Sequence, residues 1–336
     1  MIPTNPSRRQ VPAWQQELAR AFGRPDELLA YLQLAPDTPA LPAAALRAFP
    51  LRVPRGYAAR MRKGDARDPL FLQVWHRAEE AAEVAGFGDD AVGDLAKLRP
   101  GGIIHKYAGR ALVIATGTCA VHCRYCFRRH FPYAEALASR ADFGETLREL
   151  AADRSIAEVI LSGGDPLSLA DEKLARFAEA LEFLPHVERL RLHTRQPIVL
   201  PERVDPALLA WLARGRLKKI VVVHANHANE LDAAVQAALD RLAGTGATLL
   251  NQSVLLRGVN DSPEALIRLS ERLFECGVLP YYLHMLDRVR GAAHFDVPDG
   301  EARALLRAAA ARLPGYLVPR LVREEPGAAS KTALSW

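Results

Sequence analysis

The pattern of hydrophobic and polar positions changes near residue 110. From there onward, short apolar runs rich in β-branched residues alternate with amphipathic stretches, roughly every 30 residues. This alternation is typical of βα units around a parallel sheet. We expect seven strands, over residues 111–115, 158–161, 189–192, 219–223, 248–255, 281–285 and 316–321. Six crossovers between seven strands predict a TIM-like barrel that is incomplete.

Residues 1–100 have a different pattern, rich in Ala, Leu, Arg and Pro. It predicts helices over 14–22 and 69–85. The second helix has a clear start, because Asp68 can cap it and Pro69 takes its first position. We therefore expect a mostly helical N-terminal region over 1–100, followed over 101–336 by the barrel and a C-terminal segment.

Composition places the chain among ordinary globular proteins. Its 336 residues are 49% hydrophobic and 25% charged, which is enough to bury a large core. The first ten residues lack an apolar signal core, and no apolar run approaches the ~20 residues of a membrane helix. We expect a cytoplasmic protein with no membrane partner, in a compartment where thiols stay reduced.

Three cysteines are the strongest chemical signal. Cys119, Cys123 and Cys126 have the spacing C-x3-C-x2-C. A [4Fe–4S] cluster normally takes four thiolates, so three would leave one iron open to a ligand. A structural zinc site usually has four ligands in paired clusters, and a disulfide framework has an even count in a short secreted chain. The spacing favours an iron–sulfur cluster, and the distant Cys276 is interpreted as a buried, inert thiol.

Basic residues accompany the cysteine motif in a chain of net charge +5: Arg124, Arg128, Arg129 and His130. Such a group is compatible with nucleic acid, but no RNA- or DNA-binding motif accompanies it. Anionic small ligands explain it at least as well. We expect no nucleic-acid partner.

Polar clusters follow the expected strands, where a barrel gathers its chemistry. Gly163 and Gly164 allow close approach of the backbone to a ligand, and Asp165 can accept from an ammonium group. Taken alone, this segment is more often a simple turn. Lys331 follows a stretch of small residues, which suits a Schiff base with pyridoxal phosphate (PLP). A lysine in such a position is, by itself, more often merely solvated.

Taken together and in order, the motifs between residues 119 and 332 resemble the lysine 2,3-aminomutase family of radical S-adenosylmethionine (SAM) enzymes. They are Cys-Ala-Val-His-Cys-Arg-Tyr-Cys-Phe-Arg-Arg, Ser-Gly-Gly-Asp-Pro-Leu, His-Thr-Arg-Gln-Pro, His-Ala-Asn-His-Ala-Asn-Glu, Asn-Gln-Ser-Val-Leu-Leu-Arg-Gly-Val-Asn-Asp, Tyr-Tyr-Leu-His-Met-Leu-Asp and Ser-Lys-Thr. The resemblance implies a partial (β/α)6 radical SAM barrel. It also implies three cofactors: a [4Fe–4S] cluster, SAM and PLP.

The resemblance also implies roles for individual residues. Cys119, Cys123 and Cys126 would hold the cluster, whose open iron binds SAM. The residues implied around SAM are Gly163, Gly164, Asp165, His224 and Gln252. Those implied for PLP are Lys331, which binds it covalently and is catalytic, with Tyr107 and Arg110 beside it. Those implied for substrate are Arg128 for its carboxylate and Asp287 and Glu324 for its distal ammonium.

Within the family, the short chain, Glu324 and the Ser-Lys-Thr ending most resemble the bacterial aminomutases of elongation factor P (EF-P) β-lysylation. This implies conversion of L-lysine to (R)-β-lysine, which a separate ligase attaches to EF-P. It also implies an electron donor such as a flavodoxin or ferredoxin. One alternative is an aminomutase of the same chemistry that supplies β-lysine, or a related β-amino acid, to another pathway. The other is a non-catalytic iron–sulfur or nucleic-acid-binding protein.

Overall fold

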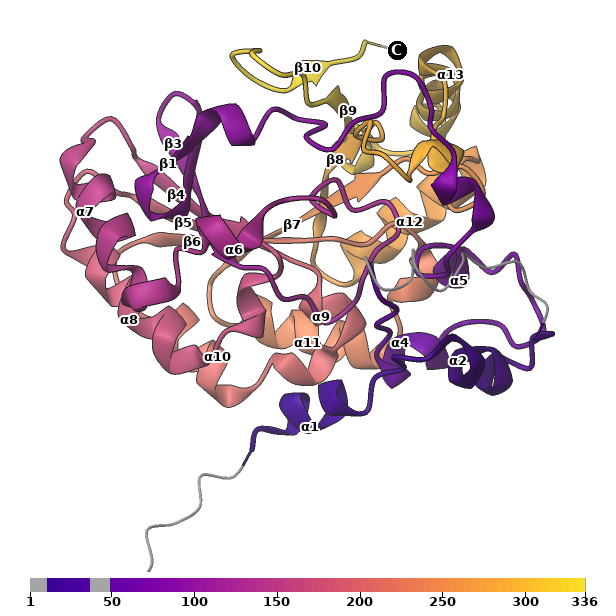
Figure 1. Cartoon of the computed structure of the whole chain (residues 1–336), viewed down its shortest axis with the longest axis horizontal. Helices are drawn as coiled ribbons and strands as arrows, with labels where there is room; N and C mark the ends of the chain where they lie inside the picture. The colour runs from indigo at the N-terminus through magenta and orange to yellow at the C-terminus, as the bar shows by residue number, and fades with distance from the viewer. Residues whose placement is uncertain (1–10, 37–48, 336) are drawn as a thin grey trace, which may run out of the picture.

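A curved, mainly parallel sheet is the centre of the computed structural model, which describes residues 11–36 and 49–335. Within these residues the sheet has ten strands, arranged in chain order (Figure 1). The parallel strands are β3 (Arg110–Thr116), β4 (Glu158–Gly163), β5 (Arg189–Thr194), β6 (Lys218–Val223), β7 (Thr248–Val254), β8 (Leu279–His284) and β9 (Arg320–Arg323).

The two outer parallel strands pair with antiparallel neighbours instead of with each other. On one side β3 pairs with β2 (Ile103–Tyr107), which pairs with β1 (Leu98–Arg99). On the other side β9 pairs with β10 (Thr332–Ala333). The sheet therefore stays open within the described residues, and the prediction of an incomplete barrel is confirmed.

Six of the seven predicted strands are confirmed to within two residues at each end. The seventh prediction, over 316–321, is wrong by four residues at its start, because β9 begins at Arg320. Tyr316 belongs instead to the 3₁₀ turn η9 (Gly315–Leu317) and is 61% exposed. Pro319 has no backbone N–H to give to a sheet ladder, so the strand begins after it.

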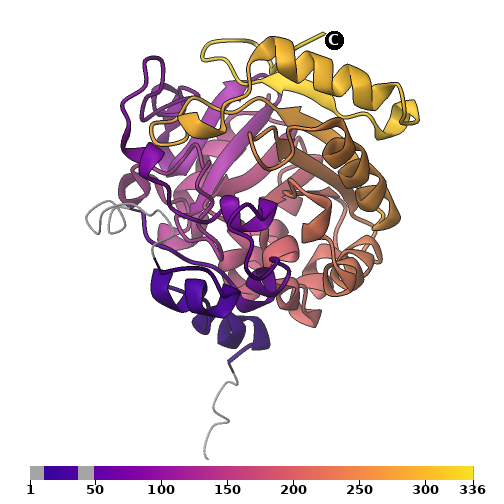
Figure 2. The same ribbon diagram turned by 90° about the vertical axis from the view of Figure 1, so that its right-hand side faces the viewer.

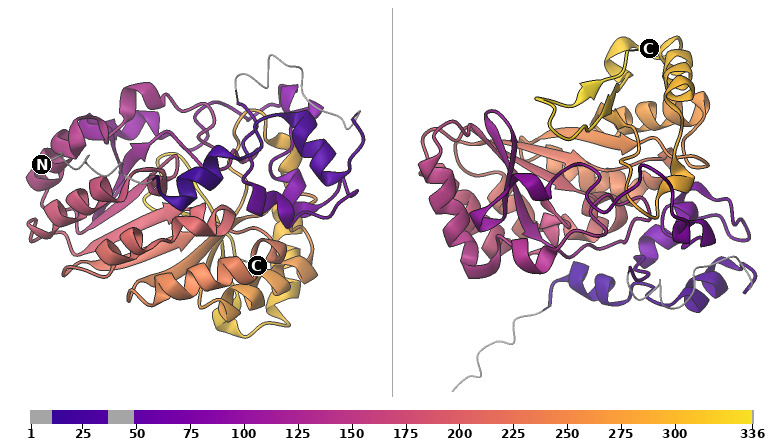
Figure 3. Two further views of the ribbon diagram at one scale, coloured as in Figure 1. Left: turned by 90° about the horizontal axis from the view of Figure 1, so that it is seen from below. Right: turned by 45° about the horizontal axis from the view of Figure 1, so that its top comes forward.

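Helices cover the outside of the curved sheet (Figure 3). They are α7 (Gly144–Ala152), α8 (Asp171–Glu182), α10 (Pro206–Leu212), α11 (Ala233–Ala243), α12 (Pro263–Glu275) and α13 (Asp299–Ala310). Leu174 of α8 and Leu239 of α11 pack with strand residues such as Val159 and Leu192 in one core of fully buried side chains. Two shorter helices, α6 (Tyr133–Ala136) and α9 (Gln196–Val199), follow the ends of β3 and β5. Cys276, directly after α12, is fully buried in this core, as predicted.

The N-terminal region forms a second core against the barrel. Its α-helices within residues 11–36 and 49–100 are α1 (Ala13–Ala19), α2 (Pro25–Leu32), α4 (Arg55–Ala59) and α5 (Pro69–Leu72). Trp14, Tyr57 and Phe71 pack there with Val121 and Val199 from the barrel. The first two helices, coloured indigo, lie at the side of the molecule opposite the yellow C-terminal segment (Figure 2). The helix expected over 14–22 is present as α1, which is shorter and ends at Ala19.

The helix predicted over 69–85 is wrong. Asp68 does cap its start, accepting from the backbone N–H groups of Leu70 at 2.8 Å and Phe71 at 3.0 Å. After one turn the helix ends, and a separate 3₁₀ turn, η1, covers Ala78–Ala81. Gln73, Val74, Trp75 and His76 are all buried. Four consecutive residues of a helix face all directions, so a helix with one exposed face cannot bury them together.

Within residues 11–36 and 49–335, none of the helices combines the length and apolar composition of a membrane span. The first ten residues, where we expected no apolar signal core, lie outside the described part of the chain.

Candidate active site

The three cysteines lie in one loop that connects β3 to α6, and their side chains are half-buried. Burial, with the nearby Asp165 carboxylate and the other two thiols, raises the pKa of Cys119. Burial and Cys123 raise the pKa of Cys126 to about 11. The three sulfur atoms are therefore close enough to interact electrostatically. Over the described residues, no three His, Cys, Asp or Glu side chains converge as ligands of one metal ion. In a [4Fe–4S] cluster each thiolate binds a different iron atom, so the sulfur atoms need not converge on one point. Three neighbouring sulfur atoms that do not converge are therefore compatible with such a cluster.

The N-terminal region holds this cysteine loop through its backbone and through buried ion pairs. The backbone N–H of Arg124 donates to the Gln73 carbonyl at 2.9 Å, and that of His122 donates to the Arg52 carbonyl at 3.1 Å. The buried Glu80 carboxylate accepts from Nε of Arg124 at 2.9 Å and from Nη2 of Arg129 at 2.7 Å. Two of the basic residues in the motif thus serve to fix the loop.

Gly163 and Gly164, at the end of β4, lie against the same loop. Gly163 has a φ of +110°, and a Cβ there would lie 2.8 Å from the Thr116 carbonyl oxygen. A Cβ on Gly164 would lie 2.6 Å from the Thr118 carbonyl oxygen. Both contacts are too short for a side chain, so this close approach of two backbones requires glycine.

Asp165 follows these glycines, and donors within the chain already occupy its buried carboxylate. It accepts from Oγ1 of Thr194 at 2.7 Å and from backbone N–H groups of Leu167 at 3.0 Å, Arg195 at 2.7 Å and Gln196 at 3.1 Å. The sequence led us to expect that this carboxylate accepts from an ammonium group. A ligand ammonium would have to displace one of these four donors, whereas the backbone of the segment remains available.

His224 directly follows β6 and faces the cysteine loop. Its Nε2 lies 3.0 Å from the Tyr125 hydroxyl, and the two rings stack with centroids 5.7 Å apart. Burial, helped by the charge of Arg195, lowers the pKa of His224 to about 3, so the imidazole is neutral at pH 7. Gln252 lies half-buried on the neighbouring strand, β7. The fold thus places one of the two residues that the sequence predicts near SAM just after β6 and the other on the adjacent β7.

Lys331 lies between β9 and β10, at the opposite edge of the sheet from β1, β2 and β3. Its ammonium forms a close ion pair with Glu324. The Tyr107 hydroxyl, at the end of β2, donates to the same carboxylate at 2.7 Å. The Arg110 guanidinium lies over the Tyr107 ring, 4.8 Å from its centroid. The fold thus brings together the three residues that the sequence predicts for PLP. Glu324, predicted to contact substrate, contacts Lys331 here.

A chain of charges connects Lys331 to Arg128. Glu324 also accepts from Nζ of Lys106 at 3.3 Å, and Lys106 pairs with the buried Asp94 at 2.7 Å. Asp94 in turn accepts from Nε of Arg128 at 2.8 Å. These alternating charges hold the pKa of Glu324 down, to about 2, with Lys331 as the strongest of the lowering influences.

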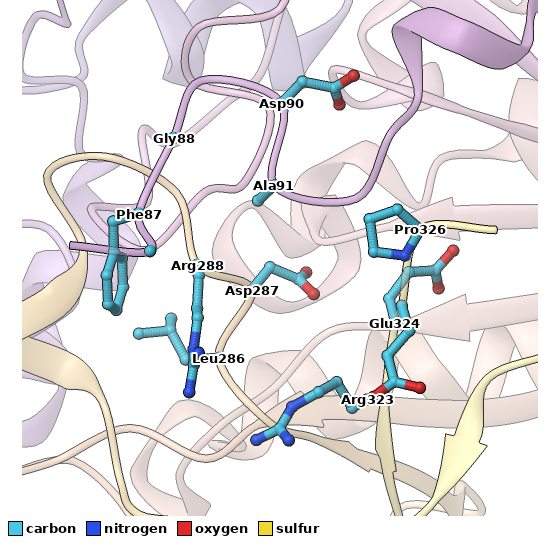
Figure 4. A pocket seen from close by; sticks show the side chains of 12 residues that line it. Phe87, Gly88, Asp90, Ala91, Leu286, Asp287, Arg288, Arg323, Glu324 and Pro326 are labelled. Atoms are coloured by element: carbon cyan, nitrogen blue, oxygen red, sulfur yellow. The ribbon is translucent and has the colours of Figure 1, made fainter. Parts of the chain in front are cut away.

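Asp287 is the acidic residue of this region for which no side-chain hydrogen bond is found in the described structure. It is half-buried, and burial raises its pKa to about 7, with Glu324 adding to the effect. Both residues line a cavity of about 560 Å³, whose opposite wall is the loop around Gly88 (Figure 4). Asp287 can therefore accept a cationic group within this cavity at the cost of one proton.

The sequence is similar to those of known proteins. Residues 113–270 match the Radical SAM superfamily. The L-lysine 2,3-aminomutase of Escherichia coli (strain K12) is 46% identical over 98% of this chain and 95% of its own length. That of Haemophilus influenzae is 43% identical, over 99% and 98%. The chain belongs to the lysine 2,3-aminomutase family of radical SAM enzymes. A crystal structure of Streptococcus suis SuiB bound to S-adenosylmethionine has a TM-score of 0.49 at 15% identity, over 69% of this chain and 53% of that one.

Membership of this family makes the protein an enzyme of the isomerase class, and the superfamily carries a [4Fe–4S] cluster and SAM. The cysteine loop fits the cluster. The region around Lys331 offers cationic partners to a further anionic group. Lys331 and Lys106 share the Glu324 carboxylate, and Arg110 lies over the Tyr107 ring. His193, on β5, adds a buried Nε2 that has no hydrogen-bond partner among the described residues.

Lys106 and Asp94 are the residues of this aminomutase-family site that sequence reasoning missed. Lys106 lies next to Tyr107 in β2, a strand that we did not predict. Asp94 comes from the N-terminal region, whose irregular backbone carries no periodic signal. Neither residue belongs to a motif, so their contribution emerges only from the fold.

Proposed function

We propose that this protein is a radical SAM, PLP-dependent lysine 2,3-aminomutase that converts L-α-lysine to (R)-β-lysine for the β-lysylation of EF-P. The proposal is supported by similar proteins and by the charges of the site. The E. coli and H. influenzae relatives bear the name L-lysine 2,3-aminomutase and match this chain over almost its whole length. The site also has charges of the kind and order that a basic amino acid requires.

The observation that carries the proposal is the continuous charge chain from Arg128 through Asp94, Lys106 and Glu324 to Lys331. It connects the residue proposed to hold the substrate carboxylate to the residue proposed to hold PLP. Asp287 and the cavity lie beside it. A single molecule bound there could place its carboxylate at Arg128 and a cationic group at Asp287, with the Lys331 amine in the same site.

When bound, the cluster and SAM supply a 5′-deoxyadenosyl radical that removes a hydrogen atom from the substrate, and PLP supplies a ring that stabilises the radical during nitrogen migration. The chain's own residues bind and orient. Arg128 offers a planar fork that suits a carboxylate, with Asp94 fixing its Nε side. Glu324 holds the Lys331 amine in place, and the Tyr107 hydroxyl donates to the Glu324 carboxylate. Orientation of this kind converts a difficult encounter into a step within one complex.

The charges also discriminate between substrates. Asp287 and Glu324 lie at one end of the site, and Arg128 lies at the other. A buried charge without a partner is costly, so a cationic side chain matches the acidic end and the substrate carboxylate matches the guanidinium. Glutamate would bring its own carboxylate against both acids. We therefore propose lysine over glutamate as substrate.

The proposed pathway adds two protein partners. A flavodoxin or ferredoxin donates the electron, and a lysine ligase transfers the β-lysine product to EF-P. The reaction belongs in the cytoplasm, where EF-P acts and where cysteines stay reduced. Support for this pathway is the resemblance of the short chain, Glu324 and the Ser-Lys-Thr ending around Lys331 to the EF-P subgroup.

The test is an anaerobic assay of iron-reconstituted protein with SAM, PLP, a strong reductant and L-lysine or L-glutamate, read by mass spectrometry after chiral derivatisation. We expect (R)-β-lysine from lysine and no product from glutamate. Absence of β-lysine from cluster-replete protein would reject the aminomutase. Transfer of the product to EF-P by the ligase, in a coupled reaction, tests the pathway, and an enantiomer that the ligase does not accept would contradict it.

A further inference from the structure

A buried arginine lies directly behind the cysteine loop. Arg195 follows β5, and its guanidinium is almost completely buried. Its Nη1 lies 2.7 Å from Sγ of Cys123 and also donates to the Tyr125 hydroxyl. Its Nη2 donates to Oε1 of Gln73 at 2.7 Å and to the Tyr57 hydroxyl at 3.2 Å. A positive charge is thus fixed beside one of the three thiols.

Glu230 neutralises and orients this guanidinium. Its fully buried carboxylate lies 2.9 Å from Nη2 of Arg195. It also accepts from the backbone N–H groups of Asn226 at 2.8 Å and His227 at 3.1 Å, and from Nε2 of Gln73 at 3.2 Å. The Nη2 side of the arginine is therefore held by Glu230, Gln73 and Tyr57, and Nη1 faces Cys123 and the Tyr125 hydroxyl.

The placement of Arg195 has a cost that packing alone does not explain. A buried charge is expensive, and an ion pair inside a protein often contributes no more than apolar residues of the same volume. This pair is nevertheless built so that the guanidinium, and not Glu230, contacts the sulfur. Hydrogen bonds to the sulfurs and the charge around a cluster both set its reduction potential.

We propose that Arg195, held by Glu230, is a positioning residue that raises the reduction potential of the [4Fe–4S] cluster through Cys123. The inference rests on the proposed function, because it needs a cluster on the three cysteines. One electron from a low-potential donor takes the cluster from its 2+ to its 1+ state, and no bond forms or breaks. The added negative charge is stabilised by a nearby cation, so Arg195 makes the reduction easier and Glu230 opposes it.

The test is a potentiometric titration of the reconstituted, full-length enzyme with SAM omitted, followed by the EPR signal of the reduced cluster. Arg195→Gln removes the charge, and we expect its potential to fall by the equivalent of at least tenfold in the reduced-to-oxidised ratio, which is 59 mV for one electron. Arg195→Lys keeps the charge and should stay closer to the wild type. Glu230→Gln leaves the arginine uncompensated and should shift the potential upward. Opposite signs for the two partners are not expected from a merely structural pair.

Arg203→Gln is the matched control. Arg203 is also fully buried and pairs with a carboxylate, that of Asp171, but its other hydrogen bonds go to the backbone of the loop after β4. This variant should lose stability without any change in potential. If Arg195→Gln fails to assemble a cluster, the upward shift of Glu230→Gln carries the test.

Two failures are distinguishable. If the wild type shows no [4Fe–4S] signal that Cys123→Ala abolishes, the proposed function itself fails. If the wild type holds the cluster while Arg195→Gln and Glu230→Gln titrate at its potential, the role of Arg195 is overturned and the proposed function stands.

Discussion

The two ends of the active site are built in different ways. The cysteine loop is fixed by backbone hydrogen bonds and by the buried Glu80 carboxylate. The Arg124 and Glu80 side chains are 0% and 1% exposed. The Lys331 end depends on side-chain contacts from a segment beside a two-residue strand, β10. There the Lys331 side chain is 25% exposed and Glu324 12%.

This difference matches what each end must do. A cluster has to stay in one geometry and away from water, so its loop gains from buried pairs that are costly to break. A site that admits and releases a substrate needs parts that open at low free energy, and these have few buried apolar contacts. The N-terminal region supplies the Glu80 carboxylate and the Gln73 and Arg52 carbonyls of the rigid end.

The largest effect that we predict is at the Lys331 end. Lys331→Ala removes the amine proposed to hold PLP, so β-lysine formation should fall by more than about 10³-fold. Among the described residues, Lys331 is linked to the cysteine loop through Glu324, Lys106 and Asp94 to Arg128, and no hydrogen bond joins it to a cysteine. The EPR signal of the reduced cluster should therefore persist. Mass spectrometry would measure β-lysine formation, and an EPR spectrum of the same preparation would measure the reduced cluster. Retention of a tenth of wild-type turnover would show that Lys331 is not the cofactor lysine.

At the rigid end, Glu80→Ala should strongly destabilise the protein. It leaves the buried guanidinium of Arg124 without its carboxylate, and breaking such a pair costs about 3–5 kcal/mol. Denaturant unfolding measures the change. Glu79→Ala is the control, because Glu79 is half-exposed and its pair with Arg77 is a surface contact worth at most about 1 kcal/mol. Equal effects of the two variants would contradict the idea that the loop depends on Glu80.

Asp287 gives the lysine end a pH dependence. With a pKa raised to about 7, it is protonated below that pH and carries the charge needed by a cationic substrate only above it. KM for lysine should therefore rise about tenfold as the pH falls from 8 to 6. Asp287→Asn should remove this slope and raise KM at pH 8 by about 10–100-fold, the effect of losing a hydrogen bond to a charged group.

Glu325→Gln is the control for Asp287, because Glu325 lines the same cavity but is exposed. It should keep the wild-type pH slope. A slope that survives in Asp287→Asn would assign the titration to another group.

The smallest expected effect concerns the fourth cysteine. Cys276 is fully buried between α12 and the start of β8, whereas the loop of the other three follows the end of β3. It packs in a different hydrophobic core from Cys123. Cys276→Ala should keep its full iron and sulfide content and lose about 1 kcal/mol of stability. Loss of iron in this variant, measured by colorimetric analysis, would mean that the cysteine loop alone does not hold the cluster.

The repeating part of the fold could be predicted from the sequence, because β-branched runs and amphipathic helices have a period. The strands from β3 to β8 follow this rule. It fails where proline or continuous burial overrides local preference, as at Pro319 before β9 and at Gln73–His76 after α5. These stretches are decided by contacts with distant parts of the chain.

The candidate site shows the same division. Motif residues such as Cys123 and Lys331 could be selected from the sequence because spacing and resemblance identify them. Their partners could not, because Asp94, Lys106 and Glu80 are ordinary charged residues until the fold places them beside a guanidinium or a carboxylate. Whether two charges pair depends on their distance in the folded protein. The local sequence around a charged residue does not reveal which distant residue will lie next to it.

The two ends of the site are built separately, and cofactor content tests this most directly. Iron and PLP would be measured on the same reconstituted preparations of wild type, Cys123→Ala and Lys331→Ala, each checked for folding by circular dichroism. We predict that Cys123→Ala loses iron and keeps PLP, and that Lys331→Ala keeps iron and loses covalently bound PLP. Folded variants that lose both cofactors together, or neither, would contradict it.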